Sequence, residues 1–213
     1  MGKIMEAVFC VAYLIVTLVF GCVIVRKAGE NKEGKLFGIM ALVLVSGDAF
    51  HLVPRIMAAV NQAGDYTKAM GIGTLITSIT MTIFYLIMYV IFEMRYDKKN
   101  RALFCSMAVL SVIRIALCLM PQNDWTGESP VSWGIYRNIP FVIMGIIMIV
   151  LFLAKRNDKA FRFMWLAILL SFAFYLPVVL WADVSPMIGM LMLPKTCMYV
   201  WMVVMGYKAA KSK

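Results

Sequence analysis

The sequence predicts an all-α fold: one domain of seven transmembrane helices that occupies residues 1–213. Three observations lead to this prediction. The chain is 63% hydrophobic, with a mean hydropathy of +0.86, which is far above that of a water-soluble domain. Apolar stretches of about 20 residues recur along it, and each is long enough to cross a hydrocarbon core about 30 Å thick. Basic residues cluster in the segments between these stretches.

The first four spans are delimited by charged or turn-forming residues. The first, Met5–Val25, ends where a basic segment with two glycines begins. The second, Leu36–Val60, ends at a polar, nearly neutral segment. The third, Ala69–Phe92, is followed by a basic segment, and the fourth, Ala102–Met120, ends at a proline. Since proline and clustered charges do not continue a membrane helix, these positions are the expected helix ends.

The last three spans follow the longest predicted loop, Pro121–Arg137. This loop contains two tryptophans, which favour the membrane interface. The fifth span, Asn138–Ala154, leads into another basic segment. A short turn separates the sixth span, Phe163–Trp181, from the seventh, Met187–Tyr207.

The positions of the basic residues predict the orientation in the membrane. Fifteen of the 21 Lys and Arg residues lie in every second connection and at the C-terminus, whereas Lys3 and Lys68, apart from Arg137 at the end of the longest loop, are the only ones in segments on the opposite side. Cytoplasmic loops carry such an excess. We therefore expect the N-terminus outside and the C-terminus in the cytoplasm. The same placement explains the net charge of +10 without a nucleic-acid partner.

The cysteines and the single histidine argue against a metal site. The five cysteines, an odd number, all lie within predicted spans, where free thiols act as small hydrophobic side chains. The sequence contains no Cys-x-x-Cys pair, and one histidine cannot build a multi-histidine zinc site. We expect neither a metal nor another cofactor.

One stretch of the second span, Val45–Arg55, carries unusual polarity. Asp48, His51 and Arg55 are spaced three and four apart, which places them on one face of a helix. Ionisable residues inside a membrane are costly and usually face the bundle interior or a wet cavity. We predict that Asp48 is a general base or acid and that His51 relays protons or orients it. The alternatives are a structural ion pair for Asp48, an interior hydrogen-bonded histidine, and an arginine that reaches the headgroups.

Helical rise places further ionisable groups near the depth of Asp48, about 11 Å below the outer face. Arg114 lies at nearly the same level, and Lys195 lies about 12 Å in from the outer end of its span. A layer with two cations and one anion needs an anionic partner, such as a phosphate, a carboxylate or a lipid headgroup. We expect a cavity open to the outside, with Arg55 and Arg137 near its rim to hold a headgroup phosphate. The predicted binding residues are Arg55, Arg114, Arg137, Lys195, Tyr13, Ser78, Tyr175 and Tyr199.

The motif Gly47-Asp48-Ala49-Phe50-His51-Leu52-Val53-Pro54-Arg55 resembles bacterial members of the lysoplasmalogenase family. Those are intramembrane enzymes that hydrolyse the vinyl-ether bond of lysoplasmalogens. The resemblance implies a catalytic role for Asp48 and a multi-pass location in a bacterial plasma membrane. The chain departs from that family in two ways. The family has eight spans, and it uses a second membrane aspartate on a late helix, where this chain has Ser171-Phe172.

Two other families are similar in outline. The seven-span alkaline ceramidase and adiponectin-receptor superfamily carries a serine and a histidine on its second span, as Ser46 and His51 are here, but its His-x-x-x-His zinc motif is replaced by Lys195-x-x-x-Tyr199. A lysine in the last span also resembles the retinal-binding lysine of rhodopsins, although no aspartate lies one turn before Lys195.

The residues together favour an intramembrane, metal-independent hydrolase that acts on a lipid or lysolipid. The alternative is a transporter or receptor that uses the same polar residues for a small anionic ligand, and a scaffold is the third possibility. The expected partners are membrane lipids and an anionic small molecule or lipid headgroup. The oligomeric state stays open.

Overall fold

The computed structural model describes residues 2–61, 63–127, 129–181 and 184–211. These residues form helices and connecting segments, with no β-strand among them. The α-helices are α1 (Gly2–Ala28), α2 (Lys32–Val60), α3 (Thr67–Tyr96), α4 (Arg101–Leu119), α5 (Val131–Ala154), α6 (Met164–Trp181) and α7 (Met192–Lys211). Two short 3-10 helices, η1 (Pro121–Asn123) and η2 (Pro186–Leu191), lie in the connections. Within the described ranges, seven helices are long and apolar enough to cross a membrane, the last of them including most of η2.

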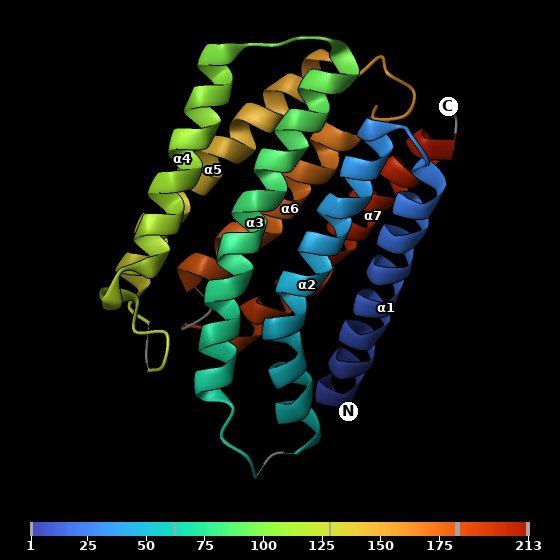
Figure 1. Cartoon of the computed structure of the whole chain (residues 1–213). Coiled ribbons are helices and arrows are strands. Elements are labelled where there is room, and N and C mark those ends of the chain that lie inside the picture. Colours follow the sequence, from blue (N-terminus) through green and yellow to red (C-terminus); the bar gives the residue numbers. More distant parts are fainter. Residues whose placement is uncertain (1, 62, 128, 182–183, 212–213) are drawn as a thin grey trace.

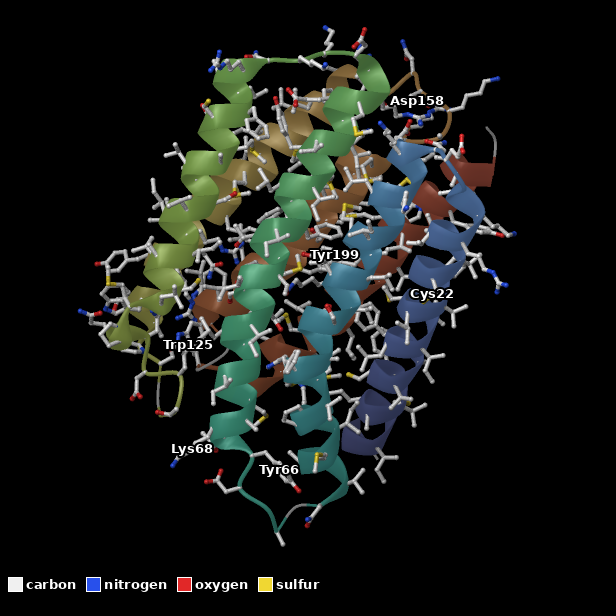
Figure 2. All side chains as sticks on the ribbon, viewed as in Figure 1. Cys22, Tyr66, Lys68, Trp125, Asp158 and Tyr199 are labelled. Carbon is white, nitrogen blue, oxygen red and sulfur yellow. The ribbon has the colours of Figure 1, made fainter. Side chains whose placement is uncertain are left out.

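The helices form one ring in chain order (Figure 1). Each helix packs against its neighbours in the sequence, and α7 returns to pack against α1 and α2. Contacts between α3 and α5 cross the ring and fill its interior. The N- and C-termini lie at opposite ends of the bundle, as an odd number of spans requires (Figure 1). Asp158 marks the end near the C-terminus, whereas Lys68 and Trp125 mark the other end (Figure 2).

Two helix boundaries differ from the prediction. α5 begins at Val131, two turns before the predicted Asn138, because the charged Arg137 is accommodated inside the helix by polar partners. The predicted seventh span is divided into η2 and α7 at Met192. Pro194 lies in the first turn of α7, where its missing N–H needs no partner, so the α-helix starts there.

Helices α2 and α3 approach each other most closely where glycines leave room. A Cβ on Gly47 would lie 1.8 Å from the Thr80 Oγ1 atom, and a Cβ on Gly73 would lie 2.2 Å from the carbonyl oxygen of Phe50. Pro54 has no N–H, so the Phe50 carbonyl has no hydrogen-bond donor four residues further along α2. The backbone of Gly73 lies against this carbonyl and shields it. The contact holds the Asp48 segment of α2 firmly against α3.

An ion network ties the helices together near the C-terminal end. Arg95 Nη1 bonds to Glu33 Oε1 at 2.6 Å, and Arg95 Nε bonds to Asp158 Oδ2 at 2.5 Å. The same guanidinium lies 4.6 Å above the ring of Phe161, and Tyr96 donates to Asp158 at 2.8 Å. Partial burial acts to raise the pKa of Asp158, but the hydrogen bonds from Arg95 and Tyr96 lower it to about 2. The α5–α6 connection is therefore anchored to α2 and α3.

Candidate functional site

The site starts from a hydrogen bond between α1 and α2. The Tyr13 hydroxyl donates to Asp48 Oδ2 at 2.5 Å. Tyr13 is buried, and its neighbours Cys10 and Thr17 on the same helical stripe are buried as well. A hydroxyl–carboxylate bond this short is typical of a charge-assisted hydrogen bond. Asp48 therefore faces the bundle interior and is held in place by α1.

Lys195, in the first turn of α7, lies between two aromatic rings. Its Nζ atom is 4.3 Å from the ring centroid of Tyr175 and 5.6 Å from that of Tyr199. Tyr199 is buried near the middle of the bundle (Figure 2). The ammonium interacts electrostatically with both Asp48 and Arg114, but it forms no ion pair within 4.0 Å with any residue that the structure describes. Lys195 is thus attracted by Asp48 on α2 and repelled by Arg114 on α4.

Arg114 is the most unusual side chain of the interior. It is 2% exposed, and its guanidinium carbon lies 3.4 Å from the centroid of the Phe141 ring. Its Nε and Nη1 atoms are buried, and neither has a hydrogen-bond acceptor among the described residues. A buried donor without a partner costs roughly 1–3 kcal/mol, and more when it is charged. Arg114 therefore presents unused hydrogen-bond donors inside the bundle.

The N-terminal half of α5 and the C-terminal half of α6 are connected by polar contacts. Tyr175 donates to Asn138 Oδ1 at 2.8 Å, and Asn138 in turn donates to the Gly134 carbonyl. Arg137 donates to Asn123 Oδ1 at 2.8 Å and stacks 4.4 Å above the ring of Trp125. Arg137 thus orders the α4–α5 connection, whereas Tyr175 belongs to the interior group around Lys195.

His51 and Arg55 contact the neighbouring helices. The Thr74 hydroxyl donates to the Met70 carbonyl, so the His51 Nδ1 atom, 3.0 Å from Thr74 Oγ1, is best placed to donate its own proton there. This contact ties α2 to α3. Arg55 forms a partly buried ion pair with Glu6 at 2.5 Å, which ties α2 to α1.

The remaining predicted residue, Ser78, donates to the Thr74 carbonyl within α3 at 2.8 Å. The structure thus groups the ten predicted residues in three sets. Tyr13, Asp48, Arg114, Tyr175, Lys195 and Tyr199 belong to one interior group: Tyr13 bonds to Asp48, and Lys195 contacts the rings of Tyr175 and Tyr199 and interacts with the charges of Asp48 and Arg114. His51 and Ser78 bond to α3, whereas Arg55 and Arg137 have partners of their own near the predicted outer end.

Sequence reasoning missed Phe141 and Asn123. Phe141 is one aromatic residue among many, so no pattern singles it out as a neighbour of Arg114. Asn123 is fully buried, and its Nδ2 atom donates to the carbonyl of Leu117 at 2.7 Å. Its position just beyond the Pro121 helix stop is the one signal that could have indicated such a capping role.

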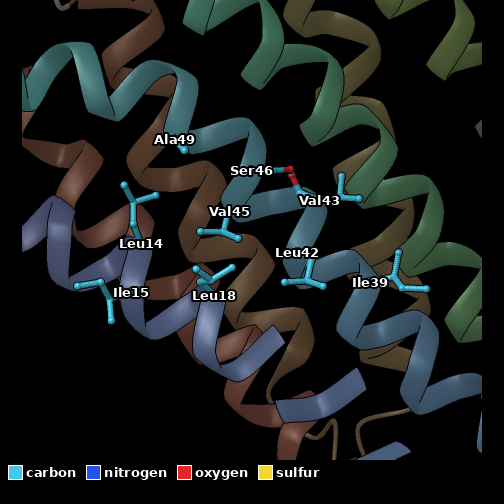
Figure 3. A pocket seen from close by; sticks show the side chains of 9 residues that line it. All are labelled: Leu14, Ile15, Leu18, Ile39, Leu42, Val43, Val45, Ser46 and Ala49. Carbon is cyan, nitrogen blue, oxygen red and sulfur yellow. The ribbon is translucent and has the colours of Figure 1, made fainter. Parts of the chain in front are cut away.

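Two apolar grooves open on the outside of the bundle beside this group. One, of about 500 Å³, runs between α1 and α2, and Ser46 is its single polar lining residue (Figure 3). The other, of about 260 Å³, lies between α1 and α7 and is lined by Tyr13 together with Phe9, Ala12, Val16, Cys197 and Val200. Neither groove is lined by Asp48, Arg114 or Lys195. The Tyr13–Asp48 pair therefore adjoins the surface that would face lipid chains.

Among the described residues, no three His, Cys, Asp or Glu side chains lie close enough together to hold a metal ion. All five cysteines are free. Comparison of the chain with protein-family models, with curated proteins and with solved structures found no match.

Proposed function

We propose that this integral membrane protein binds an anionic amphiphile, a lipid or lysolipid with a phosphate or carboxylate group, in the interior of its helix bundle. Arg114 and Lys195 hold the anionic group. The observation that carries the proposal is the pair of buried Arg114 donors that find no acceptor among the described residues. Arginine is suited to this role because its planar guanidinium matches the geometry of carboxylates and phosphates.

The charges of the interior group support an anionic ligand. Asp48 is the anion that interacts with Lys195, and it already accepts a short hydrogen bond from Tyr13. Arg114 forms no ion pair within 4.0 Å with a described residue. A buried surplus of positive charge is costly, so binding of an anion that neutralises Arg114 is favourable. The Phe141 ring shields the buried Arg114 from water, and the Tyr175 ring packs against the partly buried Lys195, which strengthens that attraction.

The lipid character of the ligand follows from the grooves. The groove lined by Tyr13 opens between α1 and α7 toward the bundle exterior, and it is almost entirely apolar. An acyl or alkenyl chain fits such a surface, and sideways entry from the bilayer would bring the headgroup toward Lys195 in the first turn of α7.

A hydrolytic reaction is the second proposal, and the Tyr13–Asp48 contact favours it. In hydrolysis of a vinyl ether, Asp48 as general acid would protonate the alkenyl carbon that is not bonded to the ether oxygen. Water would then add to the neighbouring carbon, which bears that oxygen. The water returns a proton to Asp48, and the resulting hemiacetal separates into an aldehyde and an alcohol. Asp48 enters the reaction in its protonated form. Tyr13 orients the carboxyl group, and Lys195 stabilises the carboxylate that remains after the proton has been donated. The resemblance of Gly47–Arg55 to the lysoplasmalogenase family supports this reaction.

The binding proposal is tested by native mass spectrometry of the protein purified in a mild detergent. We expect an acidic amphiphile to remain bound to the wild type and to the exposed-site control Arg101→Gln, and to be lost from Arg114→Met. Thermal unfolding with added lysophosphatidic acid or fatty acid gives a second measure, because a ligand of the folded state raises the midpoint. Equal stabilisation of wild type and a folded Arg114→Met variant would contradict the proposal.

The hydrolysis proposal has a separate test. The purified protein is incubated with a choline lysoplasmalogen, and the free aldehyde is measured. Removal of a general acid costs about 10²–10⁴-fold in rate, so we expect Asp48→Asn to lose activity to that extent while Tyr13→Phe loses less. Binding of the lysoplasmalogen without release of the aldehyde would contradict the hydrolysis proposal and would favour a receptor or transporter for the same amphiphile.

A further inference from the structure

The connection between α5 and α6 forms a surface cavity with basic lining residues, distant from the interior group. The cavity has a volume of about 430 Å³ and is lined by Arg156, Asn157, Lys159, Arg162, Phe163 and Trp165. The connection lies at the same end of the bundle as the C-terminus, which is the end predicted to face the cytoplasm (Figure 1). None of the residues that line it takes part in the proposed function.

The acidic residue of this connection is turned away from the cavity. Asp158 accepts hydrogen bonds from Arg95, Tyr96 and the Ala160 backbone N–H, so its negative charge is compensated by Arg95 and not by the cavity residues. Arg156, Lys159 and Arg162 are exposed, and none of them forms an ion pair within 4.0 Å with a described residue. The cavity therefore carries three positive charges without a compensating anion.

The connection is held in this shape by two inward anchors. Asp158 is bound to Arg95, and the Phe161 ring is buried, stacking on Phe37 at 5.8 Å between ring centroids. Residues on either side of these anchors point outward. The basic side chains are thus presented by a fixed backbone, which reduces the conformational entropy lost when a ligand binds.

Aromatic residues form the side of the cavity nearest the membrane. Phe163 is 46% exposed and directly precedes α6, and Trp165 lies in the first turn of that helix. The guanidinium of Arg162 lies 5.4 Å from the Phe163 ring centroid, and that ring stacks on Trp201 of α7. Tryptophan is enriched at the membrane interface, where headgroups meet acyl chains, and Phe163 adds an apolar ring beside Trp165. The cavity therefore has basic side chains on one side and aromatic rings on the other.

We propose that this cavity binds the phosphate of an anionic phospholipid in the leaflet on the C-terminal side. Basic pockets at the cytoplasmic face of membrane helices recognise such headgroups, and each Lys or Arg near an anionic surface contributes about fivefold in affinity. The phosphate is held by Arg156, Lys159 and Arg162, while Phe163 and Trp165 pack against the glycerol and the start of the acyl chains.

The test measures binding of dioctanoyl phosphatidic acid to the full-length protein in detergent by native mass spectrometry. The informative variant is Arg156→Gln/Lys159→Gln/Arg162→Gln, because these side chains are exposed and their removal leaves the inward anchors intact. We expect an affinity loss of about 100-fold, and of about fivefold for Lys159→Gln alone. Unchanged binding by either variant would overturn the proposal.

The matched control is Lys98→Gln/Lys99→Gln/Arg101→Gln, which removes the same charge from exposed positions of the neighbouring α3–α4 connection. We expect less than a twofold change in this control, since the three residues do not line the cavity. An equal loss in the control would mean that general surface charge, and not the cavity, binds the lipid.

Two further probes identify the source of the phosphate. Dioctanoyl phosphatidylcholine has a phosphate but no net charge, and we expect it to bind at least tenfold more weakly than phosphatidic acid. Inorganic phosphate has the charge but no chains, and we expect it to compete only at much higher concentration. Competition by inorganic phosphate at the concentration of the lipid would assign the cavity to a soluble phosphate and overturn the lipid proposal.

Discussion

Replacement of Arg95 by methionine should destabilise the bundle strongly. Arg95 binds Glu33 at 2.6 Å and Asp158 at 2.5 Å, and the three side chains are only 11–17% exposed. Removal of one partner of such a buried network leaves two carboxylates close together without their cation, which costs about 3–5 kcal/mol. Methionine retains the apolar length of the side chain, so the loss reports mainly on charge.

The pH dependence of the loss tests this reasoning. The pKa of Asp158 is lowered to about 2 in the folded protein, below the value of about 3.9 in an unfolded chain. The stabilisation from this group is therefore present above about pH 4 and is lost between about pH 4 and pH 2. The free energies of unfolding of wild type and Arg95→Met should thus converge as the pH falls below about 4, since protonation also removes the repulsion in the variant.

The assay is unfolding in mixed micelles of mild detergent and dodecyl sulfate, followed by circular dichroism. Arg101→Gln is the control, because this exposed residue at the same end should change the free energy by less than about 0.5 kcal/mol. Arg95→Met/Asp158→Asn should recover part of the loss at neutral pH. A loss below about 1 kcal/mol in Arg95→Met, or a loss that is the same at pH 3 and pH 7, would refute the reasoning.

Three further predictions concern packing, topology and metal content. Gly73→Ala should destabilise the protein by about 1–3 kcal/mol, because the new Cβ meets the Phe50 carbonyl, whereas Gly189→Ala has nothing within 4 Å and should be nearly neutral; unfolding experiments compare the two. In a cysteine-free background, a membrane-impermeant thiol reagent should label Lys68→Cys from outside intact cells and Lys98→Cys only after lysis, and the reverse pattern would invert the assigned orientation. Elemental analysis of the purified protein should find no stoichiometric transition metal, and one zinc per chain would restore a ceramidase-like interpretation.

The sequence alone was enough to predict the architecture. The described residues form an all-helical bundle with seven candidate spans, as predicted. Hydropathy decides this outcome because a span must satisfy its backbone hydrogen bonds internally and must be long enough to cross the bilayer. Both requirements depend only on residues that are close together in the sequence, so they can be predicted from the sequence.

Helix ends were less predictable because tertiary partners override local signals. The sequence predicts that a loop ends at Arg137, but Asn123 and Ser129 accept its hydrogen bonds, and α5 extends past it to Val131. Similarly, a continuous seventh span was predicted, yet its first residues form the 3-10 helix η2, and α7 starts two residues before Pro194.

The partners of the polar residues were decided by the tertiary structure. Sequence spacing placed Asp48, His51 and Arg55 on one helical face, but packing gives them separate partners: Tyr13 on α1, Thr74 on α3 and Glu6 on α1. Depth along a helix can be calculated from the rise per residue, whereas the direction in which a side chain points across the bundle depends on how seven helices rotate and pack. For that reason the sequence predicted a charged layer, and only the folded chain indicated that Arg114 is left with unused donors inside it.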